Sequence, residues 1–322
     1  MREGSALAPS LTLVLGQVVA VAFVVGLAPL LRGILERFKA RLMFRQGPPV
    51  VQPYRDLRKW FIKERVRGPY ATWLSGLSPF AYFLGPVLVA TMIPVLTAFP
   101  LPFAFTADML GAGFVLGGAG VMLLLAALEA GSAFSTIGVS RVRLVSVFAE
   151  PLTFLAVFAA AATAHATIPF VVNQTFAHAP WVVSPTHFLL VLAWFLLLLA
   201  ETGRIPVDNP LSAQELSLID PARTFEASGA DLALYEWGGW MKFMVLSIVL
   251  ANVLATPFGL ALSAAPMALG SAVVLVFAKL VLLGLVVVLV ESVFAKLRLL
   301  RIPEYLLAAV LVAFAAGASS LL

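Results

Sequence analysis

The chain has 322 residues, of which 61% are hydrophobic and only 11% are charged, and its mean hydropathy is +1.02. Soluble domains average roughly 45–50% apolar and 25% charged residues, so the composition excludes a soluble protein and predicts an all-α, polytopic integral membrane protein. The net charge of +5 would suit nucleic acid, but its distribution favours a membrane surface, and the absence of cysteine excludes disulfides, iron–sulfur ligation and cysteine-based zinc sites in this chain.

Eight apolar stretches meet or approach the length of about 20 residues that crosses roughly 30 Å of hydrocarbon. They lie near residues 11–31, 80–98, 110–128, 145–165, 187–202, 240–260, 268–290 and 304–322. We therefore expect about eight transmembrane helices in a single membrane domain, residues 1–322, without an internal repeat. The first stretch lacks an obvious cleavage site, so we expect a retained helix and not a signal peptide.

The basic residues predict the orientation of these helices. Of the 21 Lys and Arg residues, 11 lie between Arg32 and Arg67, and the other basic loops alternate with loops 99–109, 166–186 and 261–267, which contain none. By the positive-inside rule the basic loops face the cytoplasm and both termini face outward. We expect the protein in the inner (plasma) membrane.

The first basic loop contains a turn and a second helical pattern. Gly47-Pro48-Pro49 forces a turn after a basic extension of the first helix. Leu57, Trp60 and Phe61 then recur at helical spacing among bases, which suits an amphipathic helix at the membrane interface. Two roles remain open, surface anchoring and docking of a soluble partner. The candidate docking residues are Arg45, Gln52, Tyr54, Arg55, Asp56 and Lys59.

Two acids flank a basic turn between the third and fourth stretches. Glu129 ends one helix, Ser140-Arg141 is expected to form the turn, and Glu150-Pro151 is expected to start the next helix. Burial raises the pKa of a carboxyl group and a nearby arginine lowers it, so such groups can exchange protons near neutral pH. A single acid at a helix end is otherwise simply interfacial.

An acidic segment follows the fifth stretch. Gly203, Pro206 and Pro210 stop the helix there, and charged groups beside hydrocarbon are usually retained for a function. Seven carboxylates face two bases: Glu201, Asp208, Glu215, Asp220, Glu226, Asp231 and Glu236, with Arg204 and Arg223. We expect a solvated loop at Asp231 and Glu236, and functional roles for Glu201, Arg204, Asp208, Glu215 and Glu226. Glu201 and Arg204 are close enough in sequence for a salt bridge.

The seventh stretch contains Lys279, an intramembrane lysine and hence a transport candidate, and Glu291. Twelve residues span about 18 Å of helix, so we expect these two not to pair. His165, His178 and His187 are too scattered for a zinc site and are expected to be structural. We predict neither a catalytic residue nor a metal site. The glycine-rich run 111–120 predicts close helix contacts.

The segment Ala-Glu-Thr-Gly-Arg-Ile-Pro-Val-Asp-Asn-Pro, residues 200–210, resembles the signature of the membrane-anchor subunit of membrane-bound nickel-iron hydrogenases, including formate hydrogenlyase, and of subunit 1 of respiratory complex I. The resemblance continues in the first loop, at the docking residues above with Gly47 and Pro48. The resemblance extends to the second basic loop and its flanking helices, at Glu129, Gly131, Gly138, Ser140, Arg141, Ala149, Glu150 and Pro151. The chain departs from the family at Asp220-Pro221, where a His-Glu pair is usual, and at Ala227, where tyrosine is usual.

The resemblance implies an anchor that docks a peripheral redox arm and links its electron transfer to proton or sodium movement. It also implies that Glu150 belongs to a glutamate-lined entrance to the proton path. The implied partners are hydrogenase-like large and small subunits, an iron–sulfur subunit and antiporter-like membrane subunits, which would carry the nickel-iron site and the clusters. The candidate coupling residues are Glu129, Arg141, Glu150, Glu201, Arg204, Asp208, Glu215, Glu226, Lys279 and Glu291.

Three alternatives stay open. The first is a quinone-site subunit of a complex I-like oxidoreductase, and the second is an autonomous secondary ion transporter. The third is a subunit of a related complex whose large subunit has lost its nickel, since the metal ligands would lie on another chain. Loss of the family histidine removes an imidazole that titrates near neutrality, which puts the usual proton input in question.

Overall fold

A computed structural model describes residues 4–106, 108–178, 184–208 and 218–320, and in these ranges the chain is helical, without a β-strand. The long helices are α1 (Gly4–Leu42), α3 (Trp73–Met92), α4 (Met109–Glu129), α5 (Ala133–Ala164), α7 (Pro185–Glu201), α8 (Gly229–Ile248), α9 (Pro266–Val293) and α10 (Ile302–Ser320). The shorter ones are α2 (Gln52–Ile62), α6 (Pro169–His178), η2 (Pro221–Thr224), η4 (Leu299–Arg301) and a π-helix, η3 (Val249–Ala255), which continues α8.

Seven of the described helices are long and apolar enough to cross a membrane, and α7, with 17 residues, is a shorter apolar helix. Each of the eight predicted stretches overlaps one of these helices, which confirms the fold class. Some ends differ from the prediction. α5 begins at Ala133 because Ser132 caps it, with its side chain accepting a hydrogen bond from the N–H of Ser135 at 3.3 Å.

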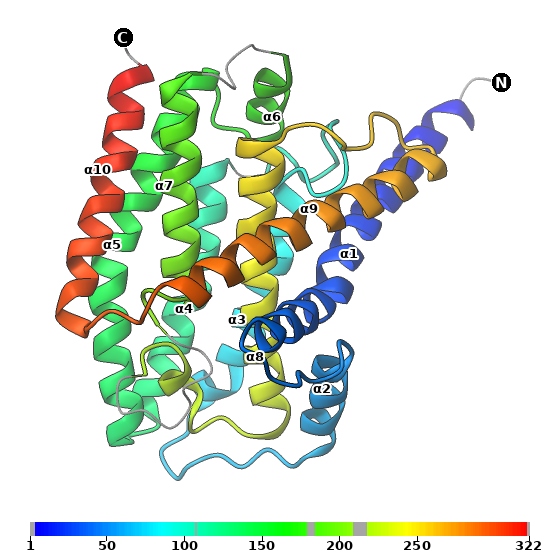
Figure 1. Ribbon diagram of the computed structural model, residues 1–322. Coiled ribbons are helices and arrows are strands. Elements are labelled where there is room, and N and C mark those ends of the chain that lie inside the picture. Colours follow the sequence, from blue (N-terminus) through cyan, green and yellow to red (C-terminus); the bar gives the residue numbers. More distant parts are fainter. Residues whose placement is uncertain (1–3, 107, 179–183, 209–217, 321–322) are drawn as a thin grey trace.

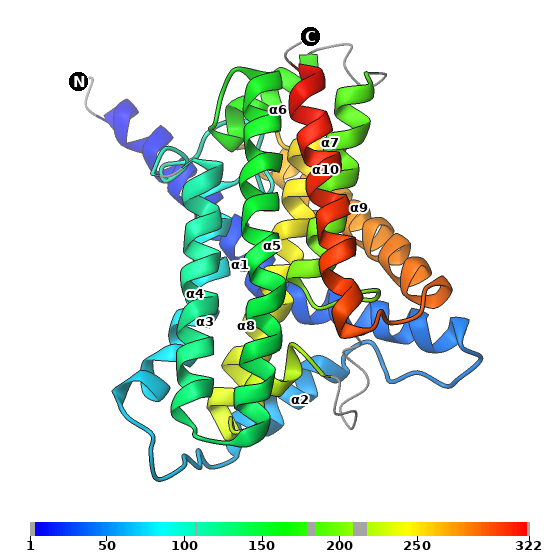
Figure 2. The same ribbon diagram turned by 90° about the vertical axis from the view of Figure 1, so that its left-hand side faces the viewer.

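The two ends of the described chain lie on the same side of the bundle, as an even number of spans requires (Figure 1). α2, the turn between α4 and α5, η2 and η4 lie together on the opposite side, and α6 lies on the side of the chain ends (Figures 1 and 2). The basic segments therefore share one face of the molecule, as their alternation along the sequence predicted.

α8 runs through the middle of the bundle, and its span is the most buried of the candidate spans. α3 packs against α4 and α8, and α10 packs against α5 and α7. Glycine permits the closest approaches: a Cβ on Gly238 would lie 2.8 Å from the ring of Tyr82, and one on Gly284 would lie 2.6 Å from Leu35, where α9 crosses α1.

The glycine-rich run of α4 behaves differently from the prediction. A Cβ on Gly117, Gly118 or Gly120 would meet nothing within 4 Å. The expected close helix contact is therefore wrong at these three positions, and they border open cavities instead.

Candidate functional site

α7 ends at Glu201 through a turn that the sequence encodes. Gly203 has a φ of 57°, the left-handed conformation that glycine adopts without strain. Its N–H donates to the carbonyl of Ala200, and the N–H of Arg204 donates to that of Leu199, at 3.3 and 2.9 Å, which is the Schellman pattern. The turn leaves Glu201 at the end of α7 and directs Arg204 away from it.

Glu201 forms an ion pair with Lys242 of α8, with 2.6 Å between Oε2 and Nζ. Lys242 was not among the site residues expected from the sequence, because it lies inside an apolar stretch, although an intramembrane cation is itself a signal. Both residues line each of three cavities, of about 340, 220 and 250 Å³. The Glu201–Lys242 pair therefore lies where the three cavities meet.

The three cavities differ in their walls. The first, which we call the apolar cavity (340 Å³), lies among α3, α4, α5, α7 and α8 and is lined mainly by hydrophobic side chains. The second, the loop cavity (220 Å³), reaches Asp208, Asp220 and Arg223. The third, the inner cavity (250 Å³), includes Arg32, Arg204, Asp220 and Glu236. Each is large enough for several water molecules, which occupy about 30 Å³ apiece in the liquid.

Arg204 does not pair with Glu201, so the expected salt bridge is wrong. Its guanidinium Nη1 lies 3.2 Å from Oε1 of Glu291, and Nζ of Lys39 lies 2.7 Å from Oε2 of the same carboxylate. The guanidinium also lies over the ring of Phe243, 4.7 Å from the centroid. Burial lowers the pKa of Arg204, and Arg32 lowers it further, against the opposing effect of Glu291. Three side chains from α1, the α7 turn and α9 thus form one buried cluster.

Asp208 organises the acidic segment. Its Oδ1 lies 2.7 Å from Nζ of Lys296, and its Oδ2 accepts hydrogen bonds from the N–H groups of Ile219 and Asp220 at 3.1 and 2.9 Å. The carboxylate is fully buried. These contacts fix the chain on both sides of residues 209–217, so the geometry gives Asp208 a structural part to play.

Asp220 is one of the positions at which the sequence was expected to depart from the family pattern. It pairs with Arg223 one turn later, and both line the loop and inner cavities. Burial opposes the charge of Arg223, but Asp220, together with Tyr82 and Glu201, raises its pKa overall. An acid–base pair therefore lies beside Glu201 and lines two of the cavities that Glu201 lines.

Glu150 lies on the exposed side of α5, at the rim of the apolar and loop cavities, and no ion-pair partner for it is found among the described residues. The expected turn at Ser140-Arg141 is wrong, because α5 is continuous from Ala133 and Pro151 lies inside it. Pro151 is tolerated there, as prolines in membrane helices are. Arg141 donates to the carbonyl of Leu218 at 2.9 Å and so contacts the acidic segment.

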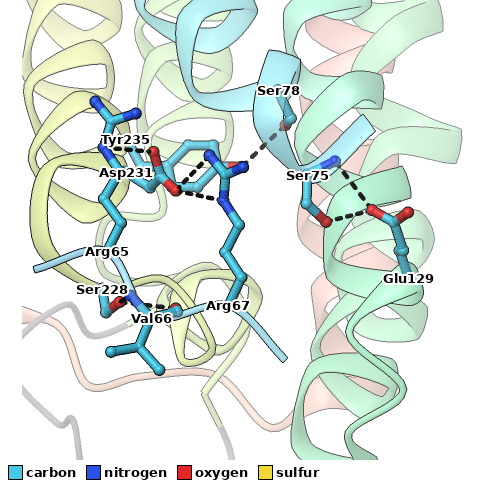
Figure 3. A network of polar contacts seen from close by, with 9 residues as sticks. All are labelled: Arg65, Val66, Arg67, Ser75, Ser78, Glu129, Ser228, Asp231 and Tyr235. Carbon is cyan, nitrogen blue, oxygen red and sulfur yellow. Dashed lines mark hydrogen bonds and ion pairs between the residues drawn. The ribbon is translucent and has the colours of Figure 1, made fainter. Parts of the chain in front are cut away.

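Glu129 lies apart from Glu150. Its carboxylate accepts a hydrogen bond from the N–H of Thr72 at 2.8 Å. It also accepts hydrogen bonds from the N–H of Ser75, at 2.9 Å, and from the hydroxyl of Ser75 (Figure 3). These donors belong to the beginning of α3, where the free N–H groups and the helix dipole favour an anion. The two acids that the sequence placed around one turn therefore occupy separate sites.

Asp231 and Glu236 both lie on α8, so the expected solvated loop is wrong for both. Asp231 is only 6% exposed and pairs with Arg67 at 3.0 Å and with Arg65 at 3.6 Å (Figure 3). Ser228 bonds both the N–H and the carbonyl of Val66, at 2.7 and 2.9 Å. Together they fasten the loop after α2 to the start of α8. Glu236 lines the inner cavity.

α2 has an anchored face and an open face. Trp60 lies against Trp240 of α8, with 6.4 Å between ring centroids, and Leu57 is buried. Tyr54 donates to the carbonyl of Gly26 in α1, and burial raises its pKa. The other docking candidates on this helix differ in their contacts: Arg55 and Lys59 are exposed, and Gln52 donates to Asp56 at 2.8 Å. Arg45 lies exposed beyond the end of α1.

The remaining candidates lie elsewhere. Lys279 donates to the carbonyls of Thr256, at 2.7 Å, and of Phe258, where η3 ends, so it does not pair with Glu291, as expected. Its role in transport stays a prediction. Glu226 is exposed, and Glu215 lies outside the described residues.

The histidines do not gather. His165 ends α5 with a φ of 51° and is exposed, whereas His187 is buried on α7; the side chain of His178 lies outside the described part. In the part of the chain that the structure describes, no three His, Asp or Glu side chains are arranged to hold a metal ion.

Comparison with known proteins decides the family. The model of the NADH dehydrogenase family matches residues 15–318, nearly the whole chain. This chain belongs to the NADH dehydrogenase family. The resemblance predicted from residues 200–210 is thus confirmed.

Three relatives show where members of the NADH dehydrogenase family occur. Formate hydrogenlyase subunit 4 of Escherichia coli (strain K12) is 31% identical over 273 residues, 84% of this chain and 87% of that protein. Hydrogenase-4 component C of the same organism is 30% identical over 281 residues, 86% of each chain. NADH-ubiquinone oxidoreductase chain 1 of Nycticebus coucang is 25% identical over 222 residues, 66% of each.

A solved structure shares the fold. A chain in the membrane-bound sulfane sulfur reductase, an archaeal respiratory membrane complex, superposes with a TM-score of 0.83 at 18% identity and covers 96% of this chain and 99% of its own length. The present NADH dehydrogenase family member is therefore a multi-pass membrane subunit of the kind that hydrogenase and complex I-like respiratory complexes contain.

Proposed function

We propose that this protein is the membrane-anchor subunit of a hydrogenase-type respiratory complex of the inner (plasma) membrane, with its basic face in the cytoplasm. It docks a peripheral redox arm and couples electron transfer in that arm to proton or sodium movement. Its relatives among formate hydrogenlyase and hydrogenase-4 components support this assignment. The nickel-iron site and the iron–sulfur clusters belong to partner subunits, since this chain has no cysteine to ligate them.

The observation that carries the proposal is the Glu201–Lys242 pair at the junction of the three cavities. A carboxylate held by an ammonium group in a partly buried, water-accessible position can release and regain a proton as its surroundings change. Around it, Glu150 stands at the rim of the apolar cavity, and Asp220 and Glu236 line the inner cavity. Water in these cavities would connect the carboxylates.

The inner cavity also leads toward the first basic loop. Arg32 and Arg204 line it, and both line a fourth cavity, which contains Lys39 and Glu291. The cavities therefore reach from Glu150 on α5 to the end of α1, close to the loop that carries α2. A redox arm seated on the exposed bases of α2 would act on the carboxylates through this connection.

Replacement of Glu201 tests the proposal. In assembled complexes, Glu201→Gln removes the carboxylate that is proposed to carry the proton, and it is expected to lower coupled proton translocation by about two orders of magnitude. The matched control is Glu64→Gln, which removes the same charge from an exposed residue after α2. Assembly is checked by co-purification of the partner subunits. Equal translocation by the two variants would refute the proposed role of Glu201.

The apolar cavity supports a second function, binding of a membrane quinone. Its volume of 340 Å³, its hydrophobic walls and the few polar groups at one end suit an apolar ligand with a polar head. Gly117 faces open space at this cavity, so Gly117→Leu is expected to fill it and abolish quinone reduction by the complex. If the purified complex reduces no quinone, this second function is excluded.

A further inference from the structure

The end of α1 is an unusual turn. The N–H of Phe44 donates to the carbonyl of Arg41 and that of Arg45 to the carbonyl of Ala40, at 3.0 and 2.8 Å, which is again the Schellman pattern. Its left-handed position holds Phe44, with a φ of 54°, where glycine is usual. A β-carbon is sterically unfavourable in that conformation. The unfavourable conformation of Phe44 must therefore be offset by some other interaction of its side chain.

Packing of the Phe44 side chain against the rest of the chain does not provide this interaction. The side chain of Phe44 is 100% exposed, and its neighbours Leu42 and Met43 are 37% and 41% exposed. The turn lies at the side of the bundle, next to the end of α9 (Figure 2). A fully exposed aromatic at this level is placed to enter the interfacial region of a bilayer, as aromatic residues at membrane surfaces do.

Beside this turn lies the fourth cavity, of about 260 Å³, between the ends of α1 and α9. Its charged lining residues are Arg32, Glu36, Lys39, Arg45, Arg204 and Glu291. Four cations and two acids leave an excess of two positive charges. The pairs within the chain account for all except one cation: Arg32 pairs with Glu36 at 2.6 Å, and Lys39 and Arg204 share Glu291.

Arg45 is the remaining cation. Its backbone is fixed by the bond to Ala40, and Gly47 presses the loop onto α1, since a Cβ there would lie 2.9 Å from the side chain of Ala40. Arg45 lines the cavity, and no ion-pair partner for its guanidinium is found among the described residues. An excess of positive charge around an unpaired guanidinium at the cytoplasmic end of membrane helices suits a phosphate group.

We propose that this cavity binds the headgroup of an anionic phospholipid, with its phosphate on Arg45 and with Phe44 inserted among the neighbouring lipids. The outer face of α9 gives the acyl chains an apolar path, since Leu282, Val286, Leu289 and Val293 are exposed along it at helical spacing. The lipid completes the charge balance around the Lys39–Glu291–Arg204 cluster. In this proposal Arg45 binds lipid and not the redox arm, so the docking face for the arm is confined to α2.

Binding of labelled phosphatidylglycerol to the delipidated complex tests the proposal. The variants are Arg45→Gln, Phe44→Gly and, as the matched control, Arg41→Gln, which removes an exposed charge from the same end of α1 but does not line the cavity. We expect one phosphatidylglycerol per chain to bind about fivefold more weakly in Arg45→Gln and unchanged in Arg41→Gln. Phe44→Gly relieves the left-handed strain, so it folds at least as well, yet it is expected to bind the lipid more weakly.

Competition separates the possible occupants. Phosphatidylcholine, which has no net charge, and inorganic phosphate, which has no acyl chains, are both expected to compete poorly. Equal binding of phosphatidylcholine, full displacement by inorganic phosphate, or identical affinity in Arg45→Gln and Arg41→Gln would each overturn the proposal. So would loss of the redox arm from Arg45→Gln complexes with unchanged lipid binding, which would make Arg45 a protein-docking residue.

Discussion

Arg204 and Glu291 are 87 residues apart in the sequence and 3.2 Å apart in the structure, as atoms Nη1 and Oε1. Lys39, from the opposite end of the chain, binds the other oxygen of the same carboxylate. One fully buried carboxylate therefore joins α1, the turn after α7 and α9, and holds two buried cations at the basic side of the bundle.

Removing the charge of Glu291 is expected to be costly. Glu291→Gln leaves Lys39 and Arg204 buried without their counter-charge, and broken buried pairs destabilise proteins by about 3–5 kcal/mol. Thermal unfolding in detergent measures the effect. The control, Glu304→Gln, changes an exposed residue of α10 and is expected to shift stability by no more than about 0.5 kcal/mol. Similar melting temperatures for both variants would contradict the importance of the cluster.

Asp231→Asn is expected to loosen the loop after α2 from α8, because Asp231 is the anion that Arg65 and Arg67 share. Both arginines are partly exposed, so we expect a loss of only about 1–2 kcal/mol. The measurement is the rate of proteolysis within residues 63–72, which is expected to be faster in Asp231→Asn than in Glu226→Gln. Glu226 is an exposed acid of the same segment. Equal cleavage of the two variants would show that the contacts in Figure 3 do not hold the loop.

Reversal of charge on the open face of α2 tests docking. Arg55→Glu with Lys59→Glu is expected to reduce co-purification of the redox arm at least about fivefold, since each surface base contributes about 1 kcal/mol. Arg298→Glu with Arg301→Glu makes the same change of charge on exposed residues of the same side. Membrane insertion is expected to be unaffected in both. Equal retention of the arm would leave α2 with membrane anchoring alone.

The isolated chain is expected to transport nothing. It offers no cysteine for a redox cluster, and Glu150 faces outward from the bundle without an ion-pair partner in the described part. Proton flux into liposomes that contain only this subunit should equal that of empty liposomes. Robust flux coupled to a substrate gradient would instead support an autonomous transporter.

Local features of the structure could be read from the sequence. The end of α7 follows from Gly203 and the prolines after it, the basic extension of α1 and the helix at 52–62 follow from their patterns, and the shared side of the basic loops follows from charge. Each of these features depends on residues that are close in the sequence or on the number of basic residues in each loop.

Contacts between distant segments could not be read in the same way. Arg204 is the basic residue nearest to Glu201 in the sequence, but the Schellman turn directs it to Glu291 of α9. Lys242 forms the ion pair with Glu201 instead. Asp231 sits in a stretch that reads as polar, yet its partners come from residues 65 and 67. Which side of a helix faces which neighbour depends on packing, and a single sequence carries no record of that.

In the proposed mechanism Glu201 carries a proton and does not merely neutralise Lys242. The double variant Glu201→Gln, Lys242→Gln separates these roles, because it removes both charges and leaves no unpaired cation at the junction of the cavities.

Proton translocation by assembled complexes is the measurement, compared across the wild type, both single variants and the double variant. If Glu201 carries the proton, Lys242→Gln retains part of the activity, whereas Glu201→Gln and the double variant both lose it. Recovery of translocation in the double variant to near the wild-type rate would contradict the claim, because it would show that Glu201 serves only to balance the charge of Lys242.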